Sequence, residues 1–381
     1  MRVLIVGGGI GGLTAAIALR KHGIEAEVFE RCPELREVGA GISLWPNAVK
    51  ALRKLGLGPA LESISLVNQE GAMRRWNGAY MSQSPAQELE RRFGGGVIVV
   101  HRAELLNLLG ENAGASTIQL GKVCTGFSQD PGGVNIRFDD GSTAHGDVLI
   151  GADGVHSVVR AGLGHNGPLR YSGYTAWRAV VPFHSSTVVA GETWGCGRRF
   201  GLLPVQGGRV YWFATHNAPE GEHDPAGGSQ AHVLSLFKGW HEPIEALIGA
   251  SSDSVILRND IYDRDALTEW GRGRVTLLGD AAHPMTPNLG QGGCQAIEDA
   301  MELATALKSA SDVDAALRKY ESRRIARTTS IVMASRRMGR MGQIESSFGC
   351  RLRDLAMQLT PNNVTIRTLA PFVGYEGHLA D

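Results

Sequence analysis

The chain has 381 residues, of which 43% are hydrophobic and 20% are charged, a composition typical of a globular protein. Its 38 basic residues balance 38 acidic ones, so no overall field attracts nucleic acid or an anionic membrane, and we expect neither as a partner. No stretch approaches the roughly 18 uninterrupted apolar residues that span a bilayer, so we predict a cytoplasmic protein without a membrane anchor. At this length two domains are the simplest expectation.

The five cysteines are scattered singly, without a CxxC pair or a ligand-like spacing to histidine, so we expect neither disulfides nor a metal site. The 51 glycines are spread along the chain rather than gathered in a linker, and no fixed-period repeat is present. This pattern favours a compact α/β protein with frequent short connections.

The first 30 residues predict a strand, a glycine loop, a helix and a second strand. Residues 3–6 are a β-branched apolar run suited to a buried strand, and a GxGxxG pattern follows at once. Its glycines permit a tight turn, the approach of a pyrophosphate, and close packing of the helix predicted at 13–21. A second strand at 25–29 leads to an acid spaced to accept hydrogen bonds from an adenosine ribose, which favours FAD or NAD over a 2′-phosphorylated coenzyme. The predicted dinucleotide site comprises Gly7, Gly9, Ile10, Gly11, Gly12, Glu30 and Arg31.

Three further motifs follow in order. REVGAGI at 36–42 precedes WPNA at 45–48, a strand turns into a helix at Asp153-Gly154, and a pair Gly279-Asp280 precedes the loop PNLGQGG at 287–293. Together they resemble the group A flavoprotein monooxygenases, a family of FAD-dependent aromatic hydroxylases. The resemblance implies an α/β fold with a Rossmann-like, GR2-type FAD-binding domain, an interleaved mixed β-sheet substrate domain and C-terminal helices.

The resemblance also implies which residues hold FAD. Asp280 is expected to bind ribityl hydroxyls, and the 287–293 loop opens a helix, predicted to about residue 308, whose positive end would stabilise negative charge on reduced flavin. Arg102, in the segment HRAEL, matches the family arginine that reaches the pyrophosphate. Asp153 has a structural alternative, since aspartate commonly caps a helix. The residues that the resemblance adds to the cofactor site are Arg36, Ala40, Gly41, Arg102, Asp153, Gly154, Gly279, Asp280, Pro287, Gly290, Gln291, Gly292 and Gly293.

Between the Asp153-Gly154 and Gly279-Asp280 motifs, the pattern changes to short alternating strands at 174–181, 199–204 and 210–215, with a hairpin turn at Gly207-Gly208. Along the last strand Tyr211, Phe213 and Thr215 share one face, and either face could line a substrate cavity. In the resembled family such a sheet covers the flavin ring. The predicted domains are an FAD-binding domain at 1–70, 98–168 and 262–320, a substrate sheet at 71–97 and 169–261, and a helical segment at 321–381.

Arg199 and Tyr211 are the main candidates for substrate contact, because a guanidinium and a phenol together hold an anionic planar molecule. The alternatives are a solvated strand end for Arg199 and ordinary sheet packing for Tyr211. His283 is a third catalytic candidate, and its alternative is packing beneath the 287–293 loop. Tyr174, Trp177 and Arg178 are further cavity candidates, each with a structural alternative.

The resemblance implies a single-component monooxygenase that uses NADH or NADPH and O2 to hydroxylate a small aromatic substrate through a flavin hydroperoxide. Bacterial urate hydroxylases look similar at Arg199 and Tyr211 but carry an acid where this chain has Asn288, so urate stays an alternative. Zeaxanthin epoxidases share the PNLGQGGC run, so an epoxidase is a second alternative. A third is an FAD reductase or dehydrogenase that consumes no O2, and a fourth is a flavoprotein kept for binding. We expect a monomer or a homodimer.

A long helix is predicted from Asp312 to about Gln343, and it carries many arginines, among them Arg324. Acidic and apolar residues intervene between these arginines, so we expect them to form a solvated face rather than a site for an anionic partner.

Overall fold

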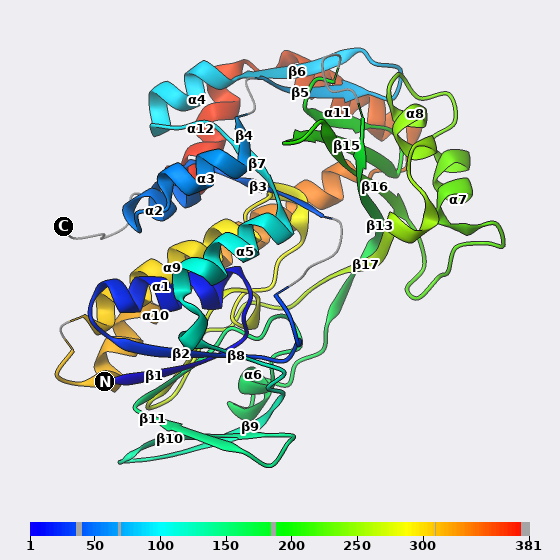
Figure 1. The fold of residues 1–381 in the computed structure, drawn as a ribbon. Helices are drawn as coiled ribbons and strands as arrows, with labels where there is room; N and C mark the ends of the chain where they lie inside the picture. Colours follow the sequence, from blue (N-terminus) through cyan, green and yellow to red (C-terminus); the bar gives the residue numbers. More distant parts are fainter. Residues whose placement is uncertain (36–39, 68–69, 184–187, 309, 375–381) are drawn as a thin grey trace.

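The computed structural model describes residues 1–35, 40–67, 70–183, 188–308 and 310–374. Figure 1 shows a parallel sheet that contains β1 and β2 on one side of the molecule and a mixed sheet that contains β13, β15 and β16 on the other. Helices α1, α5, α9 and α10 lie in the region between these sheets and above the parallel one. The predicted α/β class is confirmed.

The five-stranded sheet is parallel throughout, and its central strands are buried because they are apolar on both faces. Helices α1 and α9 pack on one face, and a three-stranded antiparallel meander lies against the other. The sheet order is β18 (Val275–Leu277), β12 (Val148–Gly151), β1 (Arg2–Val6), β2 (Glu25–Glu30) and β8 (Ile118–Leu120). The meander is β9 (Cys124–Asp130), β10 (Gly133–Phe138) and β11 (Thr143–Gly146).

The mixed sheet has seven strands, and its only parallel neighbours are β14 and β5. Its hairpin between β15 and β16 turns at Gly207 and Gly208, whose φ angles of 75° and 65° suit glycine, as predicted. The order is β17 (Leu257–Asp263), β13 (Arg170–Pro182), β16 (Arg209–Asn217), β15 (Arg198–Val205), β14 (Gly191–Trp194), β5 (Glu70–Arg75) and β6 (Tyr80–Pro85). The strands β5 and β6, from an early part of the chain, therefore complete this sheet.

A small sheet of β3 (Gly41–Leu44), β7 (Ile98–His101) and β4 (Ser65–Val67) lies beside the mixed sheet. The helices of the described residues are α1 (Ile10–Lys21), α2 (Pro46–Lys54), α3 (Gly58–Ile64), α4 (Ala86–Phe93), α5 (Arg102–Ala113), α6 (Val158–Gly162), α7 (Gly228–Leu236), α8 (Ile244–Gly249), α9 (Gly292–Leu307), α10 (Val313–Gly342), α11 (Ser347–Leu359) and α12 (Asn362–Val373). Across the described ranges, no helix combines the length and the apolar character that a membrane crossing requires.

Helix α10 begins as predicted, because the Asp312 side chain caps it by accepting a hydrogen bond from the Ala315 N–H at 3.2 Å. The prediction that its arginines form a solvated face is wrong for Arg324, which is fully buried. Arg324 pairs with Glu298 and Asp299 of α9, each at 2.6 Å. Because these partners lie on a neighbouring helix, the local charge pattern of α10 gave no sign of them.

Candidate active site

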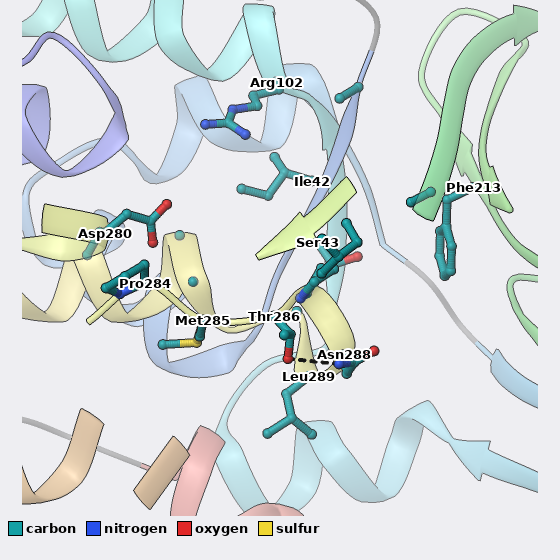
Figure 2. Close-up of a pocket in the computed structure, with 18 of the residues that line it drawn as sticks. Ile42, Ser43, Arg102, Phe213, Asp280, Pro284, Met285, Thr286, Asn288 and Leu289 are labelled. Atoms are coloured by element: carbon teal, nitrogen blue, oxygen red, sulfur yellow. Dashed lines mark hydrogen bonds between the residues drawn. The ribbon is translucent and has the colours of Figure 1, made fainter. Parts of the chain in front are cut away.

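One cavity of about 1760 Å3 lies between the two large sheets. On one side it is lined by residues that follow the carboxyl ends of the parallel strands β1, β2, β12 and β18, which is where α/β folds bind ligands. On the other side it is lined by one face of the mixed sheet. Figure 2 shows Asp280 and Phe213 on opposite sides of the loop that carries Met285 to Leu289.

The first glycine loop forms a cradle at the start of α1. Gly7 has a φ of 112°, and a Cβ on Gly12 would lie 2.0 Å from the Gly7 carbonyl oxygen. A Cβ on Gly9 would meet nothing within 4 Å, so this glycine borders open space. Helix α1 begins without a side-chain cap or an acid in its first turn, so its N-terminus attracts an anion.

Glu30 stands at the end of β2 beside this cradle. Its carboxylate accepts hydrogen bonds from the Gly8 N–H at 2.6 Å and the Cys32 N–H at 2.9 Å. It lines the cavity together with Arg31. The acid therefore holds the glycine loop and faces the cavity at once.

The 287–293 loop brings a second helix start to the same cavity. Gly290 adopts a left-handed conformation with a φ of 60°, and a Cβ there would lie 3.1 Å from Trp45 Nε1. A Cβ on Gly293 would lie 2.8 Å from Ile42 Cδ1. Helix α9 begins here without a side-chain cap or an acid in its first turn, so a second N-terminus with partial positive charge faces the cavity.

Three charged side chains line the cavity between these two helix starts. Arg102 and Asp280 both point into it (Figure 2), and burial raises the pKa of the Asp280 carboxyl, although His283 and Arg102 oppose that effect. Asp153 helps to cap α6 beside its N-cap residue Ser157, because the Asp153 Oδ2 accepts from the Val158 N–H at 2.7 Å. Its Oδ1 is buried without a hydrogen-bond partner in the described chain, so this aspartate fits both the cap and the site.

Most of the predicted cofactor residues come together around the cavity. Besides those already described, Ile10, Gly11, Ala40, Gly41, Gly154, Gly279, Pro287 and Gly292 line it. Gly12 and Gln291 do not line it: Gly12 packs under the first loop, and the Gln291 Oε1 accepts from Asn47 at 3.1 Å and Gln295 at 2.9 Å. Arg36 lies outside the described residues.

His283 packs against the Trp270 ring and does not line the cavity. Its Nε2 is 2.6 Å from Asp299 Oδ2, and Asp299 also accepts from the Gly279 N–H at 3.0 Å and from Arg324 at 2.6 Å. Burial alone would raise the pKa of Asp299, but His283 and Arg324 together lower it to about 2. Sequence motifs pointed to neither Asp299 nor Arg324, because nothing in α9 or α10 marks one acid or one arginine above the others.

The face of the mixed sheet that lines the cavity is the one with Tyr211, Phe213 and Thr215. The opposite face of β16 carries Val210, Trp212 and Ala214, which pack into a core with α7 and α8. Tyr211 both lines the cavity and packs beneath Gly41, where a Cβ would lie 2.6 Å from the tyrosine ring. Burial raises the pKa of its hydroxyl.

Arg199 is 2% exposed, so the alternative of a solvated strand end is wrong. Its Nη2 donates to Asn288 Oδ1 at 2.6 Å, and its Nη1 is 3.6 Å from Glu192. The Tyr174 hydroxyl donates to the same Asn288 oxygen at 3.1 Å.

Arg199 and Asn288 line the cavity, whereas Tyr174 lies behind them. Of the other cavity candidates, Arg178 lines the cavity, but Trp177 belongs to the core beneath the opposite face and donates to Asp224.

These residues fit FAD. Two uncapped helix starts, an open space beside Gly9 and the unpartnered Asp153 oxygen suit a ligand with phosphates and hydroxyls. Gly290, Gly292 and Gly293 of the 287–293 loop line the cavity without side chains that would collide with a flat ring. A family model described as an FAD binding domain matches residues 1–335. The chain belongs to this family.

Relatives extend this match over nearly the whole chain. Aurachin C monooxygenase/isomerase of Stigmatella aurantiaca is 43% identical over 97% of this chain and 97% of its own. FAD-dependent urate hydroxylase of Klebsiella pneumoniae is 38% identical over 88% and 89%. The crystal structure of Klebsiella pneumoniae HpxO with FAD and uric acid covers 98% of this chain and 96% of its own, with 34% identity and a TM-score of 0.92.

The predicted family, FAD cofactor and fold type are therefore confirmed, and the protein is a flavoprotein monooxygenase.

Proposed function

We propose that this enzyme takes electrons from NADH or NADPH and uses O2 to hydroxylate a small aromatic or heteroaromatic substrate. The observation that carries the proposal is that one cavity joins the glycine cradle to the Arg199 and Tyr211 face of the mixed sheet. Bound FAD supplies the oxidation chemistry that no side chain has. The protein's own residues bind, orient and shield the reactants.

For the cofactor, we assign the phosphates to the helix start at Gly9 with Arg102, and the ribose of the adenosine to Glu30. Asp280 is assigned to the ribityl hydroxyls. The start of α9 at Gly292 is assigned to the pyrimidine edge of the flavin, where partial positive charge favours the reduced, anionic form.

For the substrate, Phe213 provides an apolar wall and Tyr211 a hydroxyl. The Tyr211 hydroxyl is protonated at neutral pH, and burial raises its pKa further above 10, so it would donate a hydrogen bond to a substrate oxygen. Arg199 is paired with Glu192, which offsets its charge and favours a neutral or weakly acidic ring hydroxyl over a strongly anionic group.

Asn288 argues against urate as the substrate, although the urate hydroxylases are relatives. Its Oδ1 accepts from Arg199 and Tyr174. Its Nδ2 donates to Thr286 Oγ1 at 2.8 Å (Figure 2) and to the Ser335 carbonyl at 3.1 Å. An amide has no basic site, so this side chain cannot take a proton from the substrate as the expected acid would.

His283 is bonded to Asp299, which also accepts from the Gly279 N–H. In this proposal His283 therefore positions the Gly279 segment and does not touch the substrate.

The test is oxidation of NADH and NADPH by the FAD-loaded protein, followed with O2 uptake across phenols, phenolic acids, urate, indoles and quinolones. We expect one class to accelerate both rates and to yield a product one oxygen atom heavier. Oxidation of the nicotinamide without any oxygen-bearing product would favour a reductase. No turnover with either coenzyme would favour a binding role.

A further inference from the structure

The cavity does not end at Arg199 and Asn288. The end of α10 packs against both, since a Cβ on Gly342 would lie 2.7 Å from Arg199 Cδ and one on Gly339 would lie 2.6 Å from Asn288 Nδ2. From there the same cavity continues between β5 and the C-terminal helices α11 and α12. Its wall there includes Met73, Met338, Met341, Leu352, Met357 and Leu369, which we name the apolar branch.

The apolar branch offers little to a charged ligand. Among the described residues of α10, α11 and α12 that line the cavity, the one charged side chain is Arg353. Its guanidinium is already used: it donates to Asp354 at 2.8 Å and to the Gly195 carbonyl at 3.2 Å, and it lies over the Trp194 ring. The branch contains four methionines, whose side chains adapt to flexible apolar groups.

The branch reaches the surface at an exposed apolar face of α11. Phe348, Leu352, Leu355 and Leu359 are 78%, 59%, 49% and 72% exposed, and their spacing of four, three and four residues places them on one face of the helix. Leu352 belongs both to this face and to the cavity wall. The cavity therefore opens beside apolar side chains that would otherwise face water.

We infer that the natural substrate carries a long aliphatic chain, which lies in the apolar branch while its aromatic head lies between Arg199 and Tyr211. The inference rests on the proposed function. The volume of about 1760 Å3 exceeds the roughly 300–1,000 Å3 of ordinary ligand pockets, so the cavity has room for FAD and for more than a single ring. A chain in the branch also closes the route by which water would enter from α11.

The experiment measures binding of 4-alkylphenols, from ethyl to nonyl, to the FAD-loaded protein by calorimetry. If each added methylene is transferred from water into the apolar branch, the dissociation constant falls by up to about fourfold per methylene. The variant Met357→Glu places a charge in the branch and should abolish the dependence on chain length while ethylphenol binds as before. Leu359→Glu is the matched control on the same helix, because Leu359 is exposed and does not line the cavity; it should keep the dependence.

The inference is refuted if nonylphenol binds no more tightly than ethylphenol, or if no member binds. It is also refuted if both variants lose the dependence equally, because the chain would then adhere to the exposed face of α11. Product mass separates the two proposals. Chain-length dependence without any oxygenated product contradicts only the proposed function, whereas oxygenated ethylphenol without chain-length dependence contradicts only the aliphatic chain.

Discussion

Replacing Asp299 by Asn tests whether the buried network of Asp299, His283 and Arg324 positions the cofactor site. The carboxylate is fully buried and accepts from Gly279, His283 and Arg324. Asparagine keeps the shape but loses the charge, and it turns one acceptor into a donor that faces other donors. Breaking a buried ion pair from one side costs about 3–5 kcal/mol. We expect a loss of about 3 kcal/mol in the free energy of unfolding, because Glu298 still pairs with Arg324.

The pH dependence gives a second estimate of the same interaction. The ordinary pKa of an aspartate is 3.8, and that of Asp299 is lowered to about 2, a difference equivalent to about 2 kcal/mol. Because the folded state has the lower pKa, this stabilisation is complete above pH 3.8 and is lost as the pH falls toward 2. The stability difference between the wild type and Asp299→Asn should therefore narrow over that range.

The assay combines urea unfolding of the apoprotein with titration of FAD by flavin fluorescence. Asp263→Asn is the matched control, since Asp263 of β17 is equally buried and pairs with Arg170 of β13 at 2.8 Å and with Arg336 of α10 at 2.7 Å. Both variants should lose similar stability, but only Asp299→Asn should weaken FAD binding, by about tenfold. Equal FAD affinity in the two variants would show that the network stabilises the fold without positioning the cofactor.

Two further substitutions separate cofactor binding from substrate binding. Asp280→Ala should purify folded but largely without FAD. Its apoprotein should be about as stable as the wild type, because the Asp280 side chain is exposed to the cavity rather than packed in the core. A fully yellow preparation would remove Asp280 from the cofactor site. Arg199→Ala should leave the FAD content unchanged and raise the substrate concentration for half-maximal O2 uptake at least tenfold. Unaltered kinetics would leave Arg199 with only its structural contacts to Asn288 and Glu192.

The cofactor end of the molecule could be predicted from the sequence because its signals are local. The β-branched run and the glycine loop predict β1 and α1 to within a few residues of Arg2–Val6 and Ile10–Lys21. The Asp312 cap likewise marks the start of α10. Backbone N–H groups at a helix start hold a phosphate, and a glycine-rich loop lets the phosphate approach them. Because these glycines are close neighbours in the sequence, a short motif is enough to predict the site.

Two features could not be predicted, because their causes lie far away in the sequence. On β16 both faces are largely apolar, and only the packing of α7 and α8 against Trp212 decides that Tyr211 faces the cavity. Arg324 stands in a basic helix like its neighbours, and its burial depends on Glu298 and Asp299 of α9. The periodicity and the charge pattern of one segment do not show which helix will pack against it.

The substrate end shows why the chemistry of this protein was easier to predict than its substrate. Arg199 comes from β15, Tyr174 from β13 and Asn288 from a loop, and α10 packs against Arg199 and Asn288 where they meet. Arg199 and Tyr174 each had a structural alternative in the sequence, and contact with substrate does not exclude such a role: Arg199 is bonded to Asn288 and also lines the cavity. A substrate is held by scattered side chains whose geometry is fixed by tertiary packing, so its size and polarity follow from the shape of the cavity rather than from a motif.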